Sequence, residues 1–360
     1  MNDASDGVSM EELQLATRNH GLPLETLRFP VTPIGLHYLL THYDIPMIDP
    51  ATWRLRVDGR VARPLVLSLD DLRAMPAVTA AVTMECAGNG RALLEPRPAS
   101  QPWLLEAVGT GEWTGVPLSH VFDAAGILDD AIEVLFTGAD RGIEGGVEQS
   151  YQRSLTLADA RTGEVMLAYE LNGIPLPPQH GFPLRLVVPG WYGMTNVKWL
   201  TSITITDTEF SGYQQSNAYR LRQTKGETGA ALGRIAVRSL MVPPGIPDFF
   251  TRTRTLGPGN CSLSGRAWSG NGPIVTVDVS ADGGSSWDHA QLDPPDLGDW
   301  AWQCWRFEWL AAQGEYELCC RATDAGGNQQ PLLPEWNLGG YANNAVHRVP
   351  VLVTDNDRKT

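Results

Sequence analysis

Two short stretches of the sequence contain residue types that could do chemistry, and the first is centred on Cys86. The loop Cys86 to Gly90 (CAGNG) directly follows the apolar segment Val78 to Met84. Its small residues let backbone N–H groups approach a ligand closely, and Arg91 could stabilise a thiolate or an anion there. This setting suits either a soft-metal ligand or a nucleophile. A free cysteine is more often a small buried apolar residue, so the loop alone does not decide.

The second stretch runs from His180 to Gly190 and is followed by Lys198. With Arg185 it places a histidine, an arginine and a lysine within 18 residues, along a strand between two tight turns. Such a set could converge on a phosphate or another oxyanion. Basic residues are common on protein surfaces, so this indication is weak by itself.

Hydrophobic periodicity indicates the elements that must position these residues. Apolar and charged residues alternate from Trp53 to Asp58, which predicts a half-buried strand. Val78 to Met84 predicts a second strand that ends where the Cys86 loop begins. The first fifty residues are typical of an irregular arm with one short helix, Met10 to Arg18. We therefore expect a strand to present Cys86 and the arm to wrap around the domain.

The composition of the sequence changes between Tyr219 and Gly233, where most residues are polar. Beyond this stretch, short alternating segments separated by turn signals predict a β-sandwich. We therefore expect an α+β protein. A mixed α/β domain with the N-terminal arm would cover residues 1–230, and an all-β immunoglobulin-like sandwich would cover residues 231–360.

Composition excludes several classes of partner. The 360 residues include 27 Lys and Arg against 41 Asp and Glu, and the net charge of −14 argues against nucleic acid. No apolar run approaches the roughly 18 residues of a membrane span. The first eighteen residues lack the pattern of an export signal, so a cytoplasmic location is expected. Five cysteines without CxxC spacing predict reduced thiols rather than disulfides or a zinc site.

Several ordered motifs resemble those of one family. Glu85 to Arg91 (ECAGNGR) is similar to the molybdenum-binding loop of the sulfite oxidase family. Further segments follow at the family's usual separations, and the last three resemble its dimerisation domain: 169–173 (YELNG), 179–190 (QHGFPLRLVVPG), 197–200 (VKWL), 300–302 (WAW), 336–340 (WNLGG) and 343–349 (NNAVHRV). The resemblance covers roughly residues 30 to 353.

The resemblance implies a homodimeric oxo-molybdenum enzyme with a molybdopterin cofactor. Cys86 would be the one protein ligand to the metal, and Arg91 and Tyr219 would line the substrate pocket as catalytic residues. The pterin and its phosphate would be held by His42, Asp140, His180, Arg185 and Lys198. The implied reaction is oxidation of sulfite to sulfate by oxygen-atom transfer. The chain has no room for a haem or flavin domain, so electrons would pass to a separate acceptor, and an acidic surface would suit a basic cytochrome.

Two positions depart from the family's pattern. Members that act on sulfite read RNH where this chain has Leu40-Thr41-His42, and Gln303 stands where we align an arginine of a WAWR segment. Each charge-assisted hydrogen bond to a dianion contributes on the order of 1.5 to 3 kcal/mol, so two losses would weaken sulfite binding strongly unless other donors compensate. The sequence RNH does occur earlier, at Arg18-Asn19-His20. Val31-Thr32-Pro33 fixes the register, however, so we assign it to the arm.

Three other interpretations stay open at this point. A sulfoxide reductase, or an oxidase of another sulfur compound, would use the same cofactor and need fewer cations because a sulfoxide is neutral. A cysteine hydrolase using Cys86 and His180 would need no metal. A binding protein built on an inactive enzyme is the third, and the joint retention of Arg91, Arg185, Lys198 and the other site residues argues against it.

Overall fold

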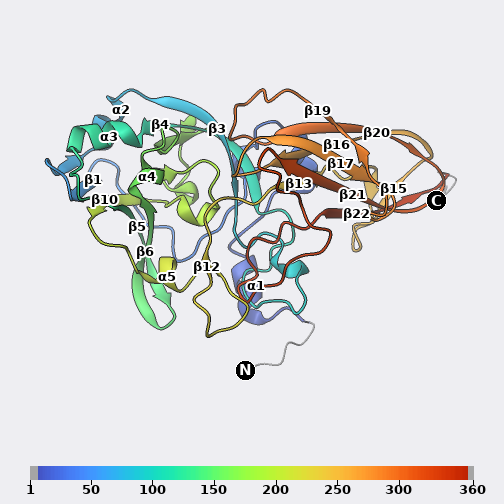
Figure 1. Cartoon of the computed structure of the whole chain (residues 1–360), viewed down its shortest axis with the longest axis horizontal. Helices are drawn as coiled ribbons and strands as arrows, with labels where there is room; N and C mark the ends of the chain where they lie inside the picture. The colour runs from blue at the N-terminus through green and yellow to red at the C-terminus, as the bar shows by residue number, and fades with distance from the viewer. Residues whose placement is uncertain (1–6, 356–360) are drawn as a thin grey trace.

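The structure is a computed structural model that describes residues 7–355. Two regions lie side by side along its longest axis (Figure 1): one mixes helices and strands, and the other consists almost wholly of strands. The expected α+β fold is confirmed. None of the helices within residues 7–355 is long and apolar enough to cross a membrane.

The first sheet of the mixed region builds its main core. Its strands are, in spatial order, β2 (Leu65–Leu67), β1 (Leu55–Gly59), β10 (Leu200–Thr206), β5 (Glu133–Glu144) and β6 (Val147–Thr156). β1 and β10 are parallel, and the other neighbours are antiparallel. Inward residues of β5, such as Val134 and Phe136, are fully buried. The nearby helices are α2 (Leu69–Arg73), α3 (Leu118–Ala125), α4 (Leu157–Ala160) and α5 (Tyr213–Ser216).

The second sheet presents the Cys86 loop. It contains β3 (Val78–Glu85), β4 (Val108–Pro117), β7 (Met166–Leu171) and β8 (Ile174–Pro175) in that order, with β9 (Arg185–Val187) paired to β7. The last four residues of β3 are buried, and Cys86 follows them directly. Because β9 carries Arg185, the two stretches that the sequence singles out meet in one sheet.

The strand-rich region is a sandwich of two sheets. One has the order β13 (Arg238–Met241), β16 (Gly259–Trp268), β20 (Gln303–Ala311) and β19 (Gln291–Leu292). The other has the order β14 (Ile246–Pro247), β15 (Arg254–Leu256), β22 (His347–Val353), β21 (Gly314–Asp324), β17 (Ile274–Ser280) and β18 (Asp288–His289). Trp305 is fully buried in the cluster that both sheets form, together with Val277 and Leu318.

The N-terminal arm contacts both regions. It contains α1 (Met10–Ala16), which is two residues shorter than expected, and the 3₁₀ helices η1 (Leu24–Arg28) and η2 (Ile34–Leu36). The backbone N–H of Leu22 donates to the carbonyl of Glu106 in the mixed region at 2.9 Å. Nε of Arg266, on β16, donates to the carbonyl of Leu27 at 2.8 Å. The arm is therefore fixed along the junction of the two regions.

A buried ion pair joins the regions just before the Cys86 loop. Oε1 of Glu85 lies 2.8 Å from Nη1 of Arg238 on β13, and both side chains are at most 3% exposed. The same carboxylate accepts a hydrogen bond from Nε1 of Trp268 at 2.8 Å and from Nδ2 of Asn89 at 3.0 Å. Glu85 therefore ties the sandwich to the loop that follows it. Other short elements near the loop are η3 (Arg91–Leu93), η4 (Pro178–His180), η5 (Gly193–Thr195), β11 (Arg220–Leu221) and β12 (Ala230–Ala231).

Candidate active site

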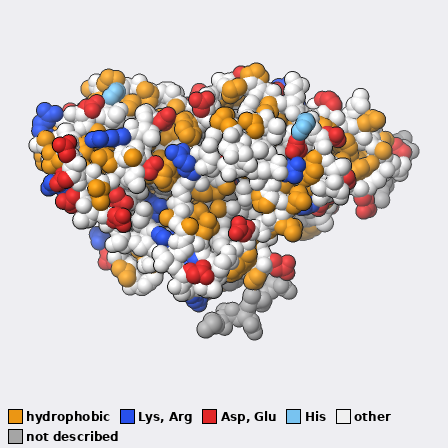
Figure 2. Space-filling model, in the orientation of Figure 1, with side chains coloured by type: hydrophobic (Ala, Val, Ile, Leu, Met, Phe, Trp, Pro, Cys, Tyr) orange, Lys and Arg blue, Asp and Glu red, His pale blue; other side chains and the backbone are white. Residues whose placement is uncertain are grey.

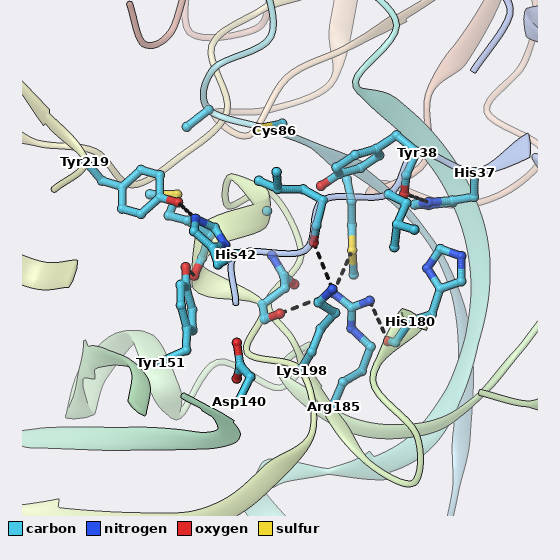
Figure 3. A pocket seen from close by; sticks show the side chains of 17 residues that line it. His37, Tyr38, His42, Cys86, Asp140, Tyr151, His180, Arg185, Lys198 and Tyr219 are labelled. Atoms are coloured by element: carbon cyan, nitrogen blue, oxygen red, sulfur yellow. Dashed lines mark hydrogen bonds between the residues drawn. The ribbon is translucent and has the colours of Figure 1, made fainter. Parts of the chain in front are cut away.

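Two neighbouring cavities share the Cys86 side chain. We call them the Lys198 cavity, which also contains Arg185 and His180, and the Arg91 cavity. Besides Cys86, the residues that line both are Leu40, His42 and Tyr219. Figure 3 shows the side chains around the Lys198 cavity, with Cys86 at its upper edge. A group bound to this sulfur would therefore face both cavities.

The local backbone fixes the position of Cys86. Its N–H donates to the carbonyl of Ala107 and its carbonyl accepts from the N–H of Asn89, both at 2.9 Å. The side chain is only 7% exposed, and this burial raises the pKa of the thiol, while the nearby charge of Arg91 acts in the opposite direction. The thiol is thus held at one point but is not activated by the protein alone.

A buried cation, Arg185, and a partly buried one, Lys198, dominate the Lys198 cavity. Nζ of Lys198 donates to the carbonyls of Leu40 at 2.8 Å and Gln179 at 3.1 Å. Arg185 donates from Nη1 to the carbonyl of His180 at 3.0 Å and from Nη2 to that of Asn196 at 3.2 Å (Figure 3). Burial lowers the pKa of Lys198 to about 7 and that of Arg185 to about 10. Within residues 7–355 neither forms an ion pair, so their charge is available to an anion.

The histidines of this cavity are neutral near pH 7. Burial lowers the pKa of His180 to about 2, of His37 to about 4 and of His42 to about 3. The rings of His37 and His180 meet edge to face, with 5.5 Å between their centroids. Neutral imidazoles can each donate one hydrogen bond and accept another, so they add polar contacts without adding charge.

Asp140 supplies the carboxylate of the Lys198 cavity. It lies in β5 where the pairing with β6 is irregular, between Thr137 and Arg141, and burial raises its pKa to about 6, which the charge of Lys198 partly counteracts. Its Oδ1 atom is buried without a hydrogen-bond partner in the described part of the chain. A bound ligand with a donor group would satisfy this atom.

Arg91 is rigidly held in the second cavity. Nε donates to the carbonyl of Gly339 at 2.9 Å, and Nη1 donates to that of Gln101 at 3.1 Å. The guanidinium carbon lies 5.1 Å from the ring centroid of Tyr341. A Cβ atom on Gly88 would lie 2.6 Å from both Nη atoms, so only glycine leaves room for the guanidinium against the Cys86 loop. The positive charge is thereby fixed next to Cys86.

Tyr219 closes the boundary between the two cavities. It has a φ of 50°, and its hydroxyl lies 2.5 Å from Nε2 of His42. Burial raises the pKa of Tyr219 well above its usual range, so the phenol stays protonated and donates to the neutral imidazole. The guanidinium of Arg153 lies 5.7 Å from the phenol ring and the ring of Tyr341 lies 5.3 Å from it, centroid to centroid.

The structure brings together every residue that the sequence proposed for the site. The Lys198 cavity is lined by His42, Cys86, Asp140, His180, Arg185, Lys198 and Tyr219, and the Arg91 cavity by Arg91, His42, Cys86 and Tyr219. Sequence reasoning missed further lining residues that come from separate elements, namely Arg18, His37, Tyr38, Tyr151 and Tyr341. The alternation of Tyr151 with Arg153, both buried on β6, is one signal that could have indicated an inward face.

One expectation about the pocket is wrong. Leu40 lines both cavities as expected, but Gln303 lines neither of them. Gln303 begins β20, and its Nε2 donates to the carbonyl of Asp293 at 2.7 Å. The preceding Trp302 is fixed by a bond from its N–H to Oγ1 of Thr83 at 2.7 Å, after which the chain continues into the sandwich. The alignment to a pocket arginine fails because β20 leads away from the cavities.

Comparison with known proteins identifies the family. Residues 42–214 match the family described as oxidoreductase molybdopterin binding domain, and residues 232–354 match the Mo-co oxidoreductase dimerisation domain. Mitochondrial sulfite oxidase of Homo sapiens is 35% identical over 346 residues, and sulfite oxidase of Gallus gallus is 36% identical over 342 residues. The chain belongs to the sulfite oxidase family of molybdenum-dependent oxidoreductases. The resemblance seen in the motifs is thereby confirmed.

The relatives of this chain are named for different reactions. The matched part covers 90% of this chain but 62% of the human protein, and 88% of this chain and 72% of the chicken protein. NADH nitrate reductase 1 of Oryza sativa subsp. japonica is 33% identical over 90% of this chain and 38% of its own length. The sulfane dehydrogenase SoxCD of Paracoccus pantotrophus superposes with a TM-score of 0.80 and 28% identity, covering 93% of this chain and 86% of that one.

The Lys198 cavity fits the molybdopterin that this family binds. Its two cations suit a phosphate, and three buried polar atoms of its lining residues lack partners in the described residues: Nε2 of His37, Oδ1 of Asp140 and Nε of Arg185. Within residues 7–355 no group of three or more His, Cys, Asp or Glu side chains could hold a metal ion. Cys86 is the one thiol that lines the cavities, so a metal there would depend on the organic cofactor for its other ligands.

The hydrolase interpretation finds little support in this geometry. His180 makes no hydrogen bond to Cys86 within the described residues, and it lies beside His37 and Arg185, away from Cys86 (Figure 3). A hydrolase would need a base close enough to deprotonate the thiol. Burial instead raises the pKa of Cys86, as stated above.

Proposed function

We propose that this protein oxidises sulfite to sulfate at a molybdenum–molybdopterin cofactor and passes the electrons to a separate acceptor. The position of Cys86 carries the proposal, because its side chain is shared by a cavity suited to the cofactor and a cavity suited to an anion. When bound, the cofactor supplies the two-electron redox chemistry of molybdenum, and Cys86 supplies the protein's ligand to the metal.

On the cofactor side, the residues of the protein bind and orient. Arg185 and Lys198 hold the phosphate, since Arg185 is buried, Lys198 is partly buried, and neither forms an ion pair with a carboxylate in the described residues. His42, Asp140 and His180 provide polar contacts to the pterin. The low exposure of these residues, at most 6% for Asp140, Arg185 and His180, excludes water from the cofactor.

On the substrate side, Arg91 binds the anion. Its bonds to Gly339 and Gln101 use Nε and Nη1, and within residues 7–355 no protein group accepts a hydrogen bond from Nη2. Nη2 can therefore donate to a sulfite oxygen without any rearrangement. Tyr219 keeps its proton on the phenol oxygen and holds His42 in one orientation, so that the shared wall of the two cavities stays fixed.

A neutral or sulfane substrate is the second candidate. Leu40 lines both cavities at the position where sulfite-oxidising relatives carry arginine, which lowers the positive charge of the pocket. The structural similarity to a sulfane dehydrogenase points in the same direction. The bulk of Leu40 and the single fixed guanidinium of Arg91 would suit a less charged sulfur compound.

Turnover by the purified holoenzyme tests the two candidates directly. Molybdenum content is measured first, and reduction of ferricyanide is then followed with sulfite, thiosulfate and dimethyl sulfide as electron donors. Nitrate and dimethyl sulfoxide are offered with a reduced dye as the donor. Sulfite as the substrate with the highest kcat/KM supports the proposal. A higher kcat/KM for any other compound overturns the sulfite assignment, and protein that contains no molybdenum after expression with cofactor overturns the mechanism.

We also propose a homodimer and an electron acceptor with a basic surface. The match of residues 232–354 to a dimerisation domain supports the homodimer. Acidic and basic side chains are interspersed on the face shown in Figure 2, and the net charge of −14 favours association with a basic cytochrome over an acidic one. Sedimentation at two protein concentrations tests the dimer, and the salt dependence of cytochrome reduction tests the acceptor.

A further inference from the structure

The N-terminal arm runs directly beside the segment that borders both cavities. His20 and Leu39 form an antiparallel bridge, in which each N–H donates to the other's carbonyl at 3.2 and 2.8 Å. Asn19 is 7% exposed, and its Oδ1 accepts from the N–H of Thr41 at 2.7 Å. Its Nδ2 donates to Oε1 of Gln101 at 3.0 Å. Asn19 therefore locks the arm against the wall of the Arg91 cavity.

The helix before this point is anchored as well. A capping box between Ser9 and Glu12 starts α1, and the buried carboxylate of Glu12 forms an ion pair with Arg97. Because the helix is fixed at its start and Asn19 fixes the chain after it, the two residues between them, Thr17 and Arg18, have defined positions. Arg18 is the charged one of the two.

The side chain of Arg18 reaches the Arg91 cavity. Nη2 of Arg18 donates to the carbonyl of His42 at 3.4 Å, and Arg18 and Arg91 both line this cavity. Within residues 7–355 no carboxylate forms an ion pair with Arg18, so its charge is not neutralised. Glu144 also lines the cavity, but its carboxylate accepts hydrogen bonds from Gln214 at 2.6 Å and from Tyr43 at 3.2 Å.

We infer that Arg18 provides a second positive charge, in addition to Arg91, for the binding of an oxyanion. It would compensate for Leu40, which stands where members of the family that act on sulfite have an arginine. The inference rests on the proposed function, because it assumes that the Arg91 cavity receives the substrate. The charge comes from the arm, about twenty residues away in sequence from the position of the family's arginine. It reaches the same cavity because the arm and residues 39–42 lie side by side.

The electrostatics of His42 support this placement. Burial lowers the pKa of its imidazole to about 3, and the positive charges of Lys198, Arg18 and Arg91 contribute in that order. The imidazole of His42 therefore lies close enough to Arg18 and Arg91 for both charges to affect its pKa. An anion in the cavity would feel the same two charges, with the exposed Arg18 screened more strongly by salt.

Substitution of Arg18 in the holoenzyme tests the inference. Arg18→Gln should raise KM for sulfite roughly two- to five-fold, the range for an exposed charge pair, and leave kcat unchanged. Arg18→Lys should keep most of the wild-type KM. Arg161→Gln is the matched control, since Arg161 is exposed and lines neither cavity, and it should behave as wild type. Increasing ionic strength should shrink the difference between wild type and Arg18→Gln.

Binding of sulfate to the holoenzyme, followed by calorimetry, separates this inference from the sulfite assignment. Sulfate should bind more weakly to Arg18→Gln than to wild type, whichever sulfur compound is turned over. Asn19→Ala, which releases the arm but keeps the charge, should weaken binding in the same way. Equal sulfate affinities in wild type and Arg18→Gln, or no sulfate binding by wild type, would overturn the inference. Weaker sulfate binding by Arg18→Gln, together with no turnover of sulfite by the wild-type holoenzyme, would instead keep the inference and count against the proposed substrate.

Discussion

The hydroxyl of Tyr219 and Nε2 of His42 lie 2.5 Å apart at the boundary of the two cavities. Burial raises the pKa of the phenol and lowers that of the imidazole to about 3, so both groups are uncharged over the range in which the protein would work. The phenol therefore always donates and the imidazole always accepts. Since the carbonyl of His42 also accepts from Arg18, this residue links the arm to Tyr219.

Tyr219→Phe should reduce kcat rather than stability alone. The substitution leaves Nε2 of His42 without its donor in a buried site, which costs about 1 to 3 kcal/mol, and it frees the ring to reorient. We expect kcat to fall by at least about tenfold, with a smaller change in KM. Steady-state kinetics measures this, with Tyr316→Phe as the control, because Tyr316 lies on strand β21 of the sandwich. A kcat equal to wild type would show that the pair is not needed for turnover.

Cys86→Ser should keep the fold and lose the metal. The hydroxyl that replaces the thiol is nearly the same size, but it is a poor ligand for a soft metal. Molybdenum content by mass spectrometry of the metal should drop, and turnover should be abolished, while circular dichroism stays unchanged. Cys261→Ser, a half-buried thiol on β16, should retain both. Substantial turnover in Cys86→Ser would contradict the role of Cys86 as the metal ligand.

Gly88→Ala should displace Arg91. The added Cβ would lie 2.6 Å from both Nη atoms, and the guanidinium cannot move without breaking its bonds to Gly339 or Gln101. KM for the anionic substrate should therefore rise, by roughly tenfold if one charge-assisted bond is lost. Gly163→Ala is the control because a Cβ there has no atom within 4 Å. Equal KM values for the two variants would mean that Arg91 does not bind substrate.

Anion binding to cofactor-free protein should weaken as the pH rises through about 7. The pKa of Lys198 is lowered to about 7 in the folded state, against about 10.4 when unfolded, so folded protein loses this proton first. Between these values the unfolded chain holds more protons, and the contribution of Lys198 makes stability rise with pH there. A dianion favours the protonated amine and so acts against that trend.

The measurement is the increase in Tm caused by sulfate, which stays a dianion throughout. The increase should be larger at about pH 6.5 than at about pH 8.5, and Lys198→Met should remove the difference. Asp140, with its pKa raised to about 6, is already ionised over most of this window. An increase that is independent of pH in the wild type would contradict a phosphate-binding role for Lys198.

Glu85→Gln should destabilise the whole chain. It leaves the buried charge of Arg238 without its partner, a loss that typically costs about 3 to 5 kcal/mol. We expect a clear drop in the free energy of unfolding in urea. The control is Asp130→Asn, which breaks an exposed pair with Arg60 and should leave the unfolding midpoint unchanged. A midpoint shift no larger than that of the control would mean that the two regions are held together by other contacts.

The sequence predicts the elements that carry the site better than it predicts distant contacts. The strand before Cys86 and the alternation of the sandwich are local patterns, and the structure reproduces both in β3 and in β16 to β22. Family motifs likewise indicate the lining residues, because each motif keeps its own spacing. Local patterns hold no information about which segments meet across the fold.

Arg18 and Gln303 illustrate that limit in opposite ways: Gln303 is expected to line the pocket and does not, whereas Arg18 is not expected there and does. Gln303 is close to a family motif in sequence, yet β20 takes it away from the cavities. Arg18 is out of register, yet the bonds of Asn19 and His20 bring it to the cavity wall. Arg18 depends on bonds of Asn19 and His20 with residues about twenty positions later, and Gln303 follows Trp302, whose N–H bonds to Thr83 in a distant strand; no single-sequence pattern encodes these contacts.

The Cys86 loop depends on a segment near the other end of the chain. Nδ2 of Asn343 donates to the carbonyl of Gly90 at 2.8 Å, and the N–H of Ala342 donates to that of Ala87 at 2.8 Å. These two pairs of partners lie 253 and 255 residues apart, so during translation the loop cannot acquire them until residue 343 has left the ribosome. We therefore expect the loop to be ready to receive a cofactor only after residues 342 and 343 have been synthesised and have folded against it.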